Sequence, residues 1–303
     1  MKLAAIDIGS NAARLFISEV GIYTDGSPDF TKVSLVRVPL RLGFEVFDTG
    51  EISTLKAEKL LQTIHAYKHL LDVYDVSLCK AVATSAMRDA SNGQQLVKQI
   101  KEETDIDIEI ISGKQEAELL LETQLRENFS ADNYYLYADV GGGSTEITIF
   151  QSSKILAQES FNVGTIRWLK DQVKEEELSA MQSFIKKTTK KYKGVLAVGS
   201  GGNINKVFSL SKQKTGLPIS LDLLRFYYKD LKKMSIQDRI HNYRLRHDRA
   251  DVIVPALKIY LSILKWGNFS EILVPQVGLV DGIIKKLYTE NYFTSLKGKR
   301  KIN

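Results

Sequence analysis

Two segments of the chain repeat one pattern, and this repeat constrains the fold more than any other feature of the sequence. The first reads AAIDIGSNAARLFI and the second LYADVGGGSTEITIF. In each, an apolar run reaches an aspartate (Asp7 or Asp139), and a glycine-containing turn then leads into a second apolar run. Apolar runs on both sides of a short glycine turn predict a β-hairpin. We therefore expect two related α/β domains, each containing one such hairpin.

The rest of the chain supplies the helices and strands that such domains need. Helical periodicity covers residues 55–74, with Ser53 as a plausible N-cap. We expect further helices at 92–104 and 114–126, strands at 33–38 and in IDIEIIS, and a strand that enters a loop in CKAVATSAMRD. A third glycine loop, VLAVGSGGNINKV, passes from strand to helix. The predicted domains are 1–124 and 125–303, and the last helix could pack back on the first domain.

Composition limits the partners of the chain. Its 303 residues include 44% hydrophobic and 26% charged residues, which is ordinary for a soluble globular protein. The chain shows no membrane-spanning run and no signal peptide, and its single cysteine cannot form an internal disulfide, so we expect a cytoplasmic protein. The net charge of +6 favours a polyanionic partner. We expect neither a membrane nor a nucleic acid as partner, and the sequence leaves a homodimer open.

The two glycine turns have the composition of phosphate-binding loops. Glycine lets backbone N–H groups approach a ligand closely, and successive N–H groups form a concave anion site. A P-loop is excluded because neither turn contains a lysine, and a dinucleotide-binding fingerprint is excluded because the glycines open a strand. A plain hairpin turn remains the alternative for either loop alone. The candidate phosphate-binding residues are Gly9, Ser10, Asn11, Gly141, Gly142, Gly143, Ser144 and Thr145.

Carboxylates beside these loops indicate a cation. A site that bound only phosphate would avoid acids, so Asp7, Asp139 and Glu146 predict a hard divalent metal, with magnesium as the best candidate. The alternatives are an exposed strand position for Glu146 and turn-forming roles for the two aspartates.

The ordered motifs DIGSNAARL, ATSAMRDASN, EIISGKQEAELL and DVGGGSTE resemble the exopolyphosphatase and guanosine pentaphosphate phosphohydrolase family. GSGGNI and RADVIVPAL resemble later motifs of that family. The resemblance covers nearly the whole chain. It implies two actin-like, ribonuclease H-like domains, each with a mixed sheet flanked by helices, and a phosphate-binding cleft between them. It also implies magnesium-dependent removal of a terminal phosphate from polyphosphate or guanosine pentaphosphate.

The resemblance also implies roles for single residues. Glu116 becomes the catalytic carboxylate, Arg88 a phosphate contact, and Gly201 part of the same cleft. From the residues alone, Ser112 and Gln115 form a capping box, so Glu116 could simply be an acid stabilised in a first helical turn. Arg88 could equally form a surface salt bridge. The chain departs from the family pattern at Ala12, Gln115, Asn203, Ala256 and Val280-Asp281.

The first functional hypothesis is an exopolyphosphatase, in which water held by Glu116 attacks the terminal phosphorus. Guanosine pentaphosphate is the alternative substrate. A second hypothesis is a non-catalytic sensor of polyphosphate or nucleotide, which Ala12 and Gln115 would favour. A phosphotransferase of the same fold is a third, although the sequence shows no adenosine pocket or acceptor site.

Overall fold

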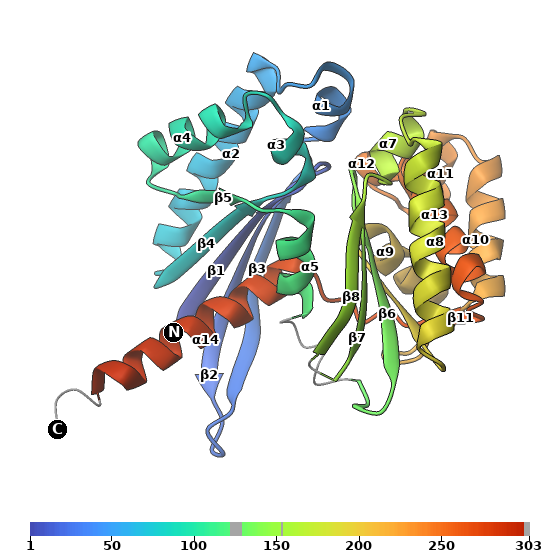
Figure 1. The fold of residues 1–303 in the computed structure, drawn as a ribbon. Coiled ribbons are helices and arrows are strands. Elements are labelled where there is room, and N and C mark those ends of the chain that lie inside the picture. Colours follow the sequence, from blue (N-terminus) through green and yellow to red (C-terminus); the bar gives the residue numbers. More distant parts are fainter. Residues whose placement is uncertain (122–128, 153, 300–303) are drawn as a thin grey trace. The chain divides into compact units, whose positions relative to one another are not determined.

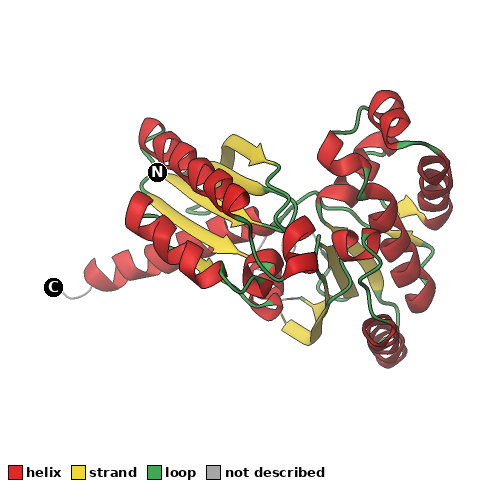
Figure 2. Ribbon diagram, turned by 90° about the horizontal axis from the view of Figure 1, so that it is seen from above, coloured by secondary structure: helices red, strands yellow, loops and turns green. Residues whose placement is uncertain are grey.

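The computed structural model describes the chain except residues 122–128, 153 and 300–303, and it leaves the side chains of residues 121 and 292–299 undescribed. The chain divides into two mixed α/β units (Figure 1). Unit 1 comprises Met1–Gln124 and Gly278–Asn303, and unit 2 comprises Leu125–Val277. Each unit is a sheet flanked by helices, as the sequence predicts (Figure 2). In the described part of the chain, no helix is long and apolar enough to span a membrane.

Unit 1 is a five-stranded sheet in the order β3-β2-β1-β4-β5. Strands β1, β4 and β5 run parallel, whereas β2 and β3 are antiparallel to their neighbours. The elements are β1 (Lys2–Ile8), β2 (Ala13–Ile22), β3 (Pro28–Val38), α1 (Gly43–Thr49), α2 (Thr54–Val73), β4 (Leu78–Ala83), α3 (Ser85–Asp89), α4 (Gly93–Thr104), β5 (Ile108–Ile110), α5 (Gly113–Leu121) and α14 (Leu279–Lys299).

The alternation of side chains along the strands decides which residues form the core of unit 1. Alternate residues of β1, such as Ile6 and Ile8, pack in one buried cluster with Leu60 and Ile64 of α2. Ser53 is the N-cap of helix α2, as predicted, because its hydroxyl accepts a hydrogen bond from the Lys56 amide. Helix α14 contacts β1, β2 and β4, so the C-terminal segment belongs to this unit.

Two details of unit 1 differ from the sequence prediction. The segment after β4 is the short helix α3 instead of a loop, and it carries Arg88. A helix of one turn is too short to leave a periodic pattern. The predicted helix at 114–126 is observed as α5 up to Leu121, and the rest of it lies outside the described residues.

Unit 2 contains a four-stranded sheet in the order β8-β7-β6-β9 and a small two-stranded sheet of β10 and β11. Helices α8 and α13 pack against each other, with α8 also against β8 and α13 against β6. The elements are β6 (Tyr134–Val140), β7 (Thr145–Gln151), β8 (Lys154–Phe161), α7 (Thr165–Leu169), α8 (Glu175–Lys191), β9 (Leu196–Ser200), α9 (Gly202–Ser211), β10 (Ile219–Ser220), α10 (Leu221–Lys233), α11 (Ile236–Tyr243), α12 (His247–Ala250), α13 (Ile253–Gly267) and β11 (Glu271–Ile272).

The two glycine turns close hairpins of the same geometry. In the β1–β2 hairpin, the Gly9 amide donates to the Ala12 carbonyl at 3.1 Å. In the β6–β7 hairpin, the Gly141 amide donates to the Ser144 carbonyl at 2.9 Å. Each hairpin is followed by an antiparallel third strand, and each first strand has a parallel neighbour on its other side. The sequence repeat is therefore a repeat of the sheet topology.

Candidate active site

The predicted site residues of unit 1 lie at one edge of its sheet. The β1–β2 turn follows β1, Arg88 lies in the helix after β4, and Glu116 lies in the helix after β5. Because β1, β4 and β5 are parallel, their carboxyl ends meet at this edge. The carboxyl ends of parallel strands are the usual ligand-binding edge of α/β sheets.

The first turn is held by bonds to its carbonyl groups. The Ser10 carbonyl accepts from the Gly43 amide at 2.9 Å, and the Asn11 carbonyl accepts from the Arg41 amide at 3.0 Å. The Ser10 hydroxyl is buried and lies 2.7 Å from the Ser85 hydroxyl. Within the described chain, the amides of Ser10 and Ala12 donate to no protein acceptor. Fixed carbonyls with unused amides are what a phosphate cradle requires.

Asp7 forms an ion pair. Its carboxylate is 3% exposed and accepts from the Arg14 guanidinium at 2.5 Å. The pair follows from the hairpin register, which places Asp7 directly opposite Arg14. The metal-binding role of Asp7 stays a prediction, and Arg14 supplies the charge that balances this carboxylate.

Arg88 and Glu116 are connected through the segment between β5 and α5. The Arg88 guanidinium donates to the Ile111 carbonyl at 2.8 Å. The capping box is confirmed: the Gln115 amide donates to the Ser112 hydroxyl at 3.2 Å, and the Ser112 amide donates to the Gln115 side chain at 2.9 Å. Glu116 is half-buried in the first turn of this capped helix. The structure thus fixes the guanidinium of Arg88 and the backbone of Glu116, and their catalytic roles stay predictions.

The glycine loop of unit 2 is held even more completely than the loop of unit 1. Its carbonyls at Gly141, Gly142 and Gly143 accept from the Thr165 amide (3.0 Å), the Ile166 amide (2.8 Å) and the Arg167 side chain (2.9 Å). In the described part of the chain, the amides of Gly142, Gly143 and Ser144 donate to no protein acceptor. Helix α7 therefore occupies the carbonyl side of the loop and leaves three consecutive N–H groups for a ligand.

Close packing explains a glycine that precedes α7. A Cβ added at Gly164 would lie 2.3 Å from the Gly142 carbonyl oxygen. In the described chain, positive φ occurs at Gly201, and not at Gly9 or at the glycines of 141–143. Close approach of the neighbouring backbone, and not a positive φ, accounts for the glycine at position 164.

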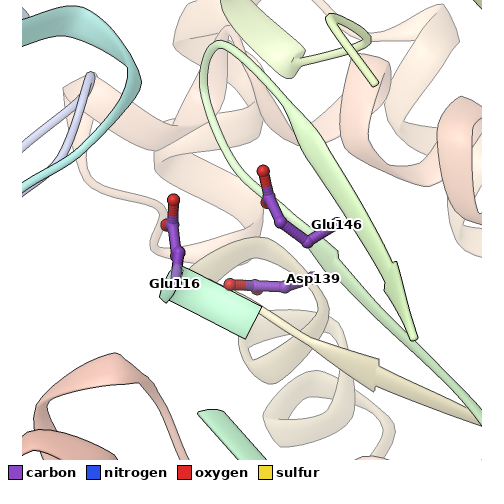
Figure 3. A group of neighbouring side chains, drawn as sticks. All are labelled: Glu116, Asp139 and Glu146. Atoms are coloured by element: carbon purple, nitrogen blue, oxygen red, sulfur yellow. The ribbon is translucent and has the colours of Figure 1, made fainter. Parts of the chain in front are cut away.

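Two carboxylates face each other beside this loop. Asp139 on β6 is directly opposite Glu146 on β7, and their oxygens approach within 4.8 Å of one another. Glu146 is 1% exposed and accepts from the Ser160 hydroxyl of β8 at 2.9 Å. Figure 3 shows these two side chains on the β6–β7 hairpin. The alternative of an exposed strand position for Glu146 does not hold.

The third glycine loop packs against the same aspartate. Gly201 has φ +115°, and a Cβ added there would lie 3.2 Å from the Asp139 carboxylate. The buried Tyr260 of α13 donates its hydroxyl to the Ser200 carbonyl just before this loop. Burial raises the pKa of Tyr260 well above its ordinary value. Tyr260 therefore stays neutral, holds the third loop and stands close to Asp139.

Several residues of this site were not predicted from the sequence. Arg14 and Ser160 face the predicted acids through strand register, which could have been counted along each hairpin. Gly164 and Tyr260 act through tertiary contacts that leave no local signal. Among the predicted phosphate ligands, Thr145 is fully buried and donates its hydroxyl to the Val163 carbonyl, so its phosphate contact stays a prediction.

The residues fit a hard divalent cation. Carboxylate oxygens are the ligands that magnesium prefers, and it commonly keeps several waters and substrate phosphates. Two like charges held beside each other at a buried site are unfavourable without a proton or a cation. Asp139 and Glu146 would hold the ion in unit 2. Asp7, the third predicted metal ligand, lies in unit 1 and is paired with Arg14.

A model of the Ppx/GppA phosphatase family matches residues 22–290. The chain belongs to this family. Solved members that are similar to it include an exopolyphosphatase from Cytophaga hutchinsonii (TM-score 0.81, 25% identity, 96% of this chain and 97% of that chain). A family member from Aquifex aeolicus is similar as well (TM-score 0.77, 25% identity, 96% and 98%). The two-unit α/β fold of this Ppx/GppA chain is thus the fold of its family.

The curated relatives of this family member are longer than the chain. Exopolyphosphatase 1 of Mycobacterium tuberculosis is 29% identical over 175 residues, which are 56% of this chain and 50% of the relative. A guanosine-5'-triphosphate,3'-diphosphate pyrophosphatase of Aeromonas salmonicida is 22% identical over 302 residues, which are 95% of this chain and 60% of the relative. The chain therefore spans about half the length of the first relative and somewhat more of the second.

Proposed function

We propose that this chain hydrolyses the terminal phosphoanhydride bond of inorganic polyphosphate. The observation that carries the proposal is the glycine loop at 141–144. Its carbonyls are occupied by α7, its amides at Gly142, Gly143 and Ser144 have no acceptor in the described chain, and Asp139 and Glu146 stand beside it. Three unused amides next to two carboxylates suit a phosphate group that arrives with a divalent cation.

In the proposed reaction, the amides of the two glycine loops bind the oxygens of the terminal phosphate. Arg88 binds the same group through its guanidinium, whose planar fork suits phosphate. Glu116 orients a water molecule toward the phosphorus and accepts its proton. A new oxygen–phosphorus bond forms, the bond to the bridging oxygen breaks, and its electron pair stays on the shortened chain. Orthophosphate is released.

A divalent cation at Asp139 and Glu146 would neutralise charge on the phosphate oxygens. The capped helix orients Glu116, and the bond from Arg88 to the Ile111 carbonyl orients the guanidinium. Phosphoryl transfer depends mainly on positioning and charge stabilisation, so a weakly basic carboxylate is sufficient. Ala12 supplies no hydroxyl to the first loop, which therefore contributes backbone amides and Ser10.

Guanosine pentaphosphate is the second candidate substrate. The relative from Aeromonas salmonicida, named a guanosine-5'-triphosphate,3'-diphosphate pyrophosphatase, aligns with 95% of this chain. The same loops would bind its terminal 5'-phosphate, and the reaction at phosphorus would be the same.

The test is phosphate release from long polyphosphate and from guanosine pentaphosphate, measured side by side with magnesium and with a chelator. We expect magnesium-dependent release that is faster from polyphosphate. Faster release from guanosine pentaphosphate would reverse the order of the two substrates. Binding of either substrate without any release would favour the non-catalytic sensor over the hydrolase.

A further inference from the structure

The segment that follows β3 lies against the first glycine turn. The Arg41 amide donates to the Asn11 carbonyl at 3.0 Å, and the Gly43 amide donates to the Ser10 carbonyl at 2.9 Å. Strand pairing extends up to this contact, because Ala13 at the start of β2 pairs with Val38 at the end of β3. Arg41 is therefore attached by its backbone to the predicted phosphate loop of unit 1.

Arg41 is held in an uncommon conformation. Its φ is +56°, in the left-handed region that residues other than glycine seldom adopt. Its guanidinium carbon lies 3.8 Å from the centre of the Phe44 ring, a cation–π contact. The backbone bond to Asn11 and the aromatic contact together fix the side chain beside the loop. Strained residues of this kind concentrate at sites that bind ligands.

A second cation lies next to Arg41. The Lys56 ammonium donates to the Leu40 carbonyl at 2.5 Å, immediately before Arg41 in the chain. Burial lowers the pKa of Lys56, the charges of Lys59 and Arg41 lower it further, and Glu45 opposes them. Glu45 in turn accepts from the Ser53 amide at 3.2 Å. Two cations are thus kept within interaction range of each other by bonds to backbone.

We propose that Arg41 and Lys56 form a second anion subsite, which binds the phosphates of a polyphosphate chain beyond the terminal one. The inference rests on the proposed function and deepens it by assigning a preference for long chains to two residues. A guanidinium fork and an ammonium group are the usual protein partners of phosphate oxygens. Their attachment to the first glycine turn places the subsite next to the loop that takes the chain end.

The variants Arg41→Gly and Lys56→Gln test the subsite. Glycine adopts the positive φ of Arg41 without strain, so this substitution removes the cation and spares the backbone. The matched control is Lys68→Gln, because Lys68 is on the same helix and pairs with Asp72. It lies roughly 18 Å further along α2, at about 1.5 Å per residue.

The measurements are KM and kcat for long polyphosphate and for tripolyphosphate. Each variant should raise KM for the long polymer about tenfold, which corresponds to the loss of one good charged contact. kcat and the KM for tripolyphosphate should change less than about twofold. Lys68→Gln should behave as wild type, and the charge-retaining Lys56→Arg should keep a KM close to that of wild type.

Two outcomes would overturn the subsite: an unchanged KM for the long polymer in both variants, or an equal rise in KM for both substrates. Binding of fluorescently labelled polyphosphate without magnesium separates this result from failure of the proposed function. A wild-type protein that binds the polymer without hydrolysing it, with weaker binding in both variants, would retain the subsite and overturn the hydrolase. A wild-type protein that does not bind polyphosphate would overturn both.

Discussion

Asp139 lies directly opposite Glu146 across strands β6 and β7, at the place where Asp7 lies opposite Arg14 across β1 and β2. The two hairpins are equivalent, but the partner of the aspartate has opposite charge. In the first, the aspartate is balanced by an arginine at 2.5 Å. In the second, the buried Glu146 carboxylate lies opposite another carboxylate, the half-buried Asp139, instead of a guanidinium. This difference favours the second hairpin as the cation site.

Removal of the Asp139 carboxylate should raise the stability of the metal-free protein and should lower the stability that magnesium adds. In a chelator, Asp139→Asn should raise the unfolding temperature because it relieves the repulsion with Glu146. Magnesium should stabilise the wild type, by about 2.7 kcal/mol at a concentration 100 times the dissociation constant, and should hardly stabilise the variant. Thermal unfolding with and without magnesium measures both effects.

The comparison for this experiment is Asp7→Asn, which tests the other predicted metal ligand, an acid that is already paired with Arg14. It should leave the magnesium-induced rise in place while lowering the stability of the chelated protein. A variant at Asp139 that keeps the full magnesium effect would place the cation elsewhere.

Glu116→Gln should reduce turnover and spare binding. A positioned carboxylate contributes about 10²–10⁴ in rate, so we expect kcat to fall at least about a hundredfold. The glutamine keeps the size of the side chain, so polyphosphate affinity should stay close to that of wild type. Glu118→Gln is the matched control, because Glu118 is exposed on the same helix α5. Equal turnover of Glu116→Gln and the control would remove Glu116 from the mechanism.

Local sequence signals predicted the parts of the site that depend on neighbouring residues. The two hairpins follow from apolar runs around glycine turns, and the helix cap at Ser112 follows from its spacing to Gln115. The contacts of α7 with the carbonyls of the glycine loop join residues more than twenty positions apart. No local pattern encodes such a contact. The ion pair of Asp7 with Arg14 depends on strand register, which a one-residue shift of the hairpin would remove.

Gly164→Ala should damage the glycine loop of unit 2. Its new methyl group would lie 2.3 Å from the Gly142 carbonyl oxygen and 2.4 Å from the Gly143 carbonyl carbon, so loop and helix α7 must separate. Such overpacking typically costs about 1–3 kcal/mol. The loop amides should also lose their fixed geometry, and KM for polyphosphate should rise along with a fall in kcat. Gly21→Ala is the control, because an added Cβ there meets nothing within 4 Å. If Gly164→Ala matches this control in stability and kinetics, α7 does not shape the loop.

Asp281 should make stability depend on pH. Burial raises the pKa of this carboxyl above its ordinary value of 3.8, although the Gly278 amide donates to it at 2.8 Å and Lys32 lies near enough to oppose the shift. A raised pKa means that the folded protein binds the proton more tightly than the unfolded chain. The stabilisation from the protonated group is therefore complete below the ordinary pKa and is lost as the pH rises through the folded pKa.

Asp281→Asn should remove this dependence while keeping an oxygen that can accept from Gly278. We expect the variant to gain stability over the wild type as the pH rises from about 4 toward neutrality, because the wild-type carboxyl must then ionise while buried. Urea unfolding at a series of pH values measures the difference. Asp222→Asn is the comparison, since the Asp222 side chain is 89% exposed. A difference between Asp281→Asn and wild type that stays constant over this pH range would contradict the assignment, because an uncharged contact has the same strength at every pH.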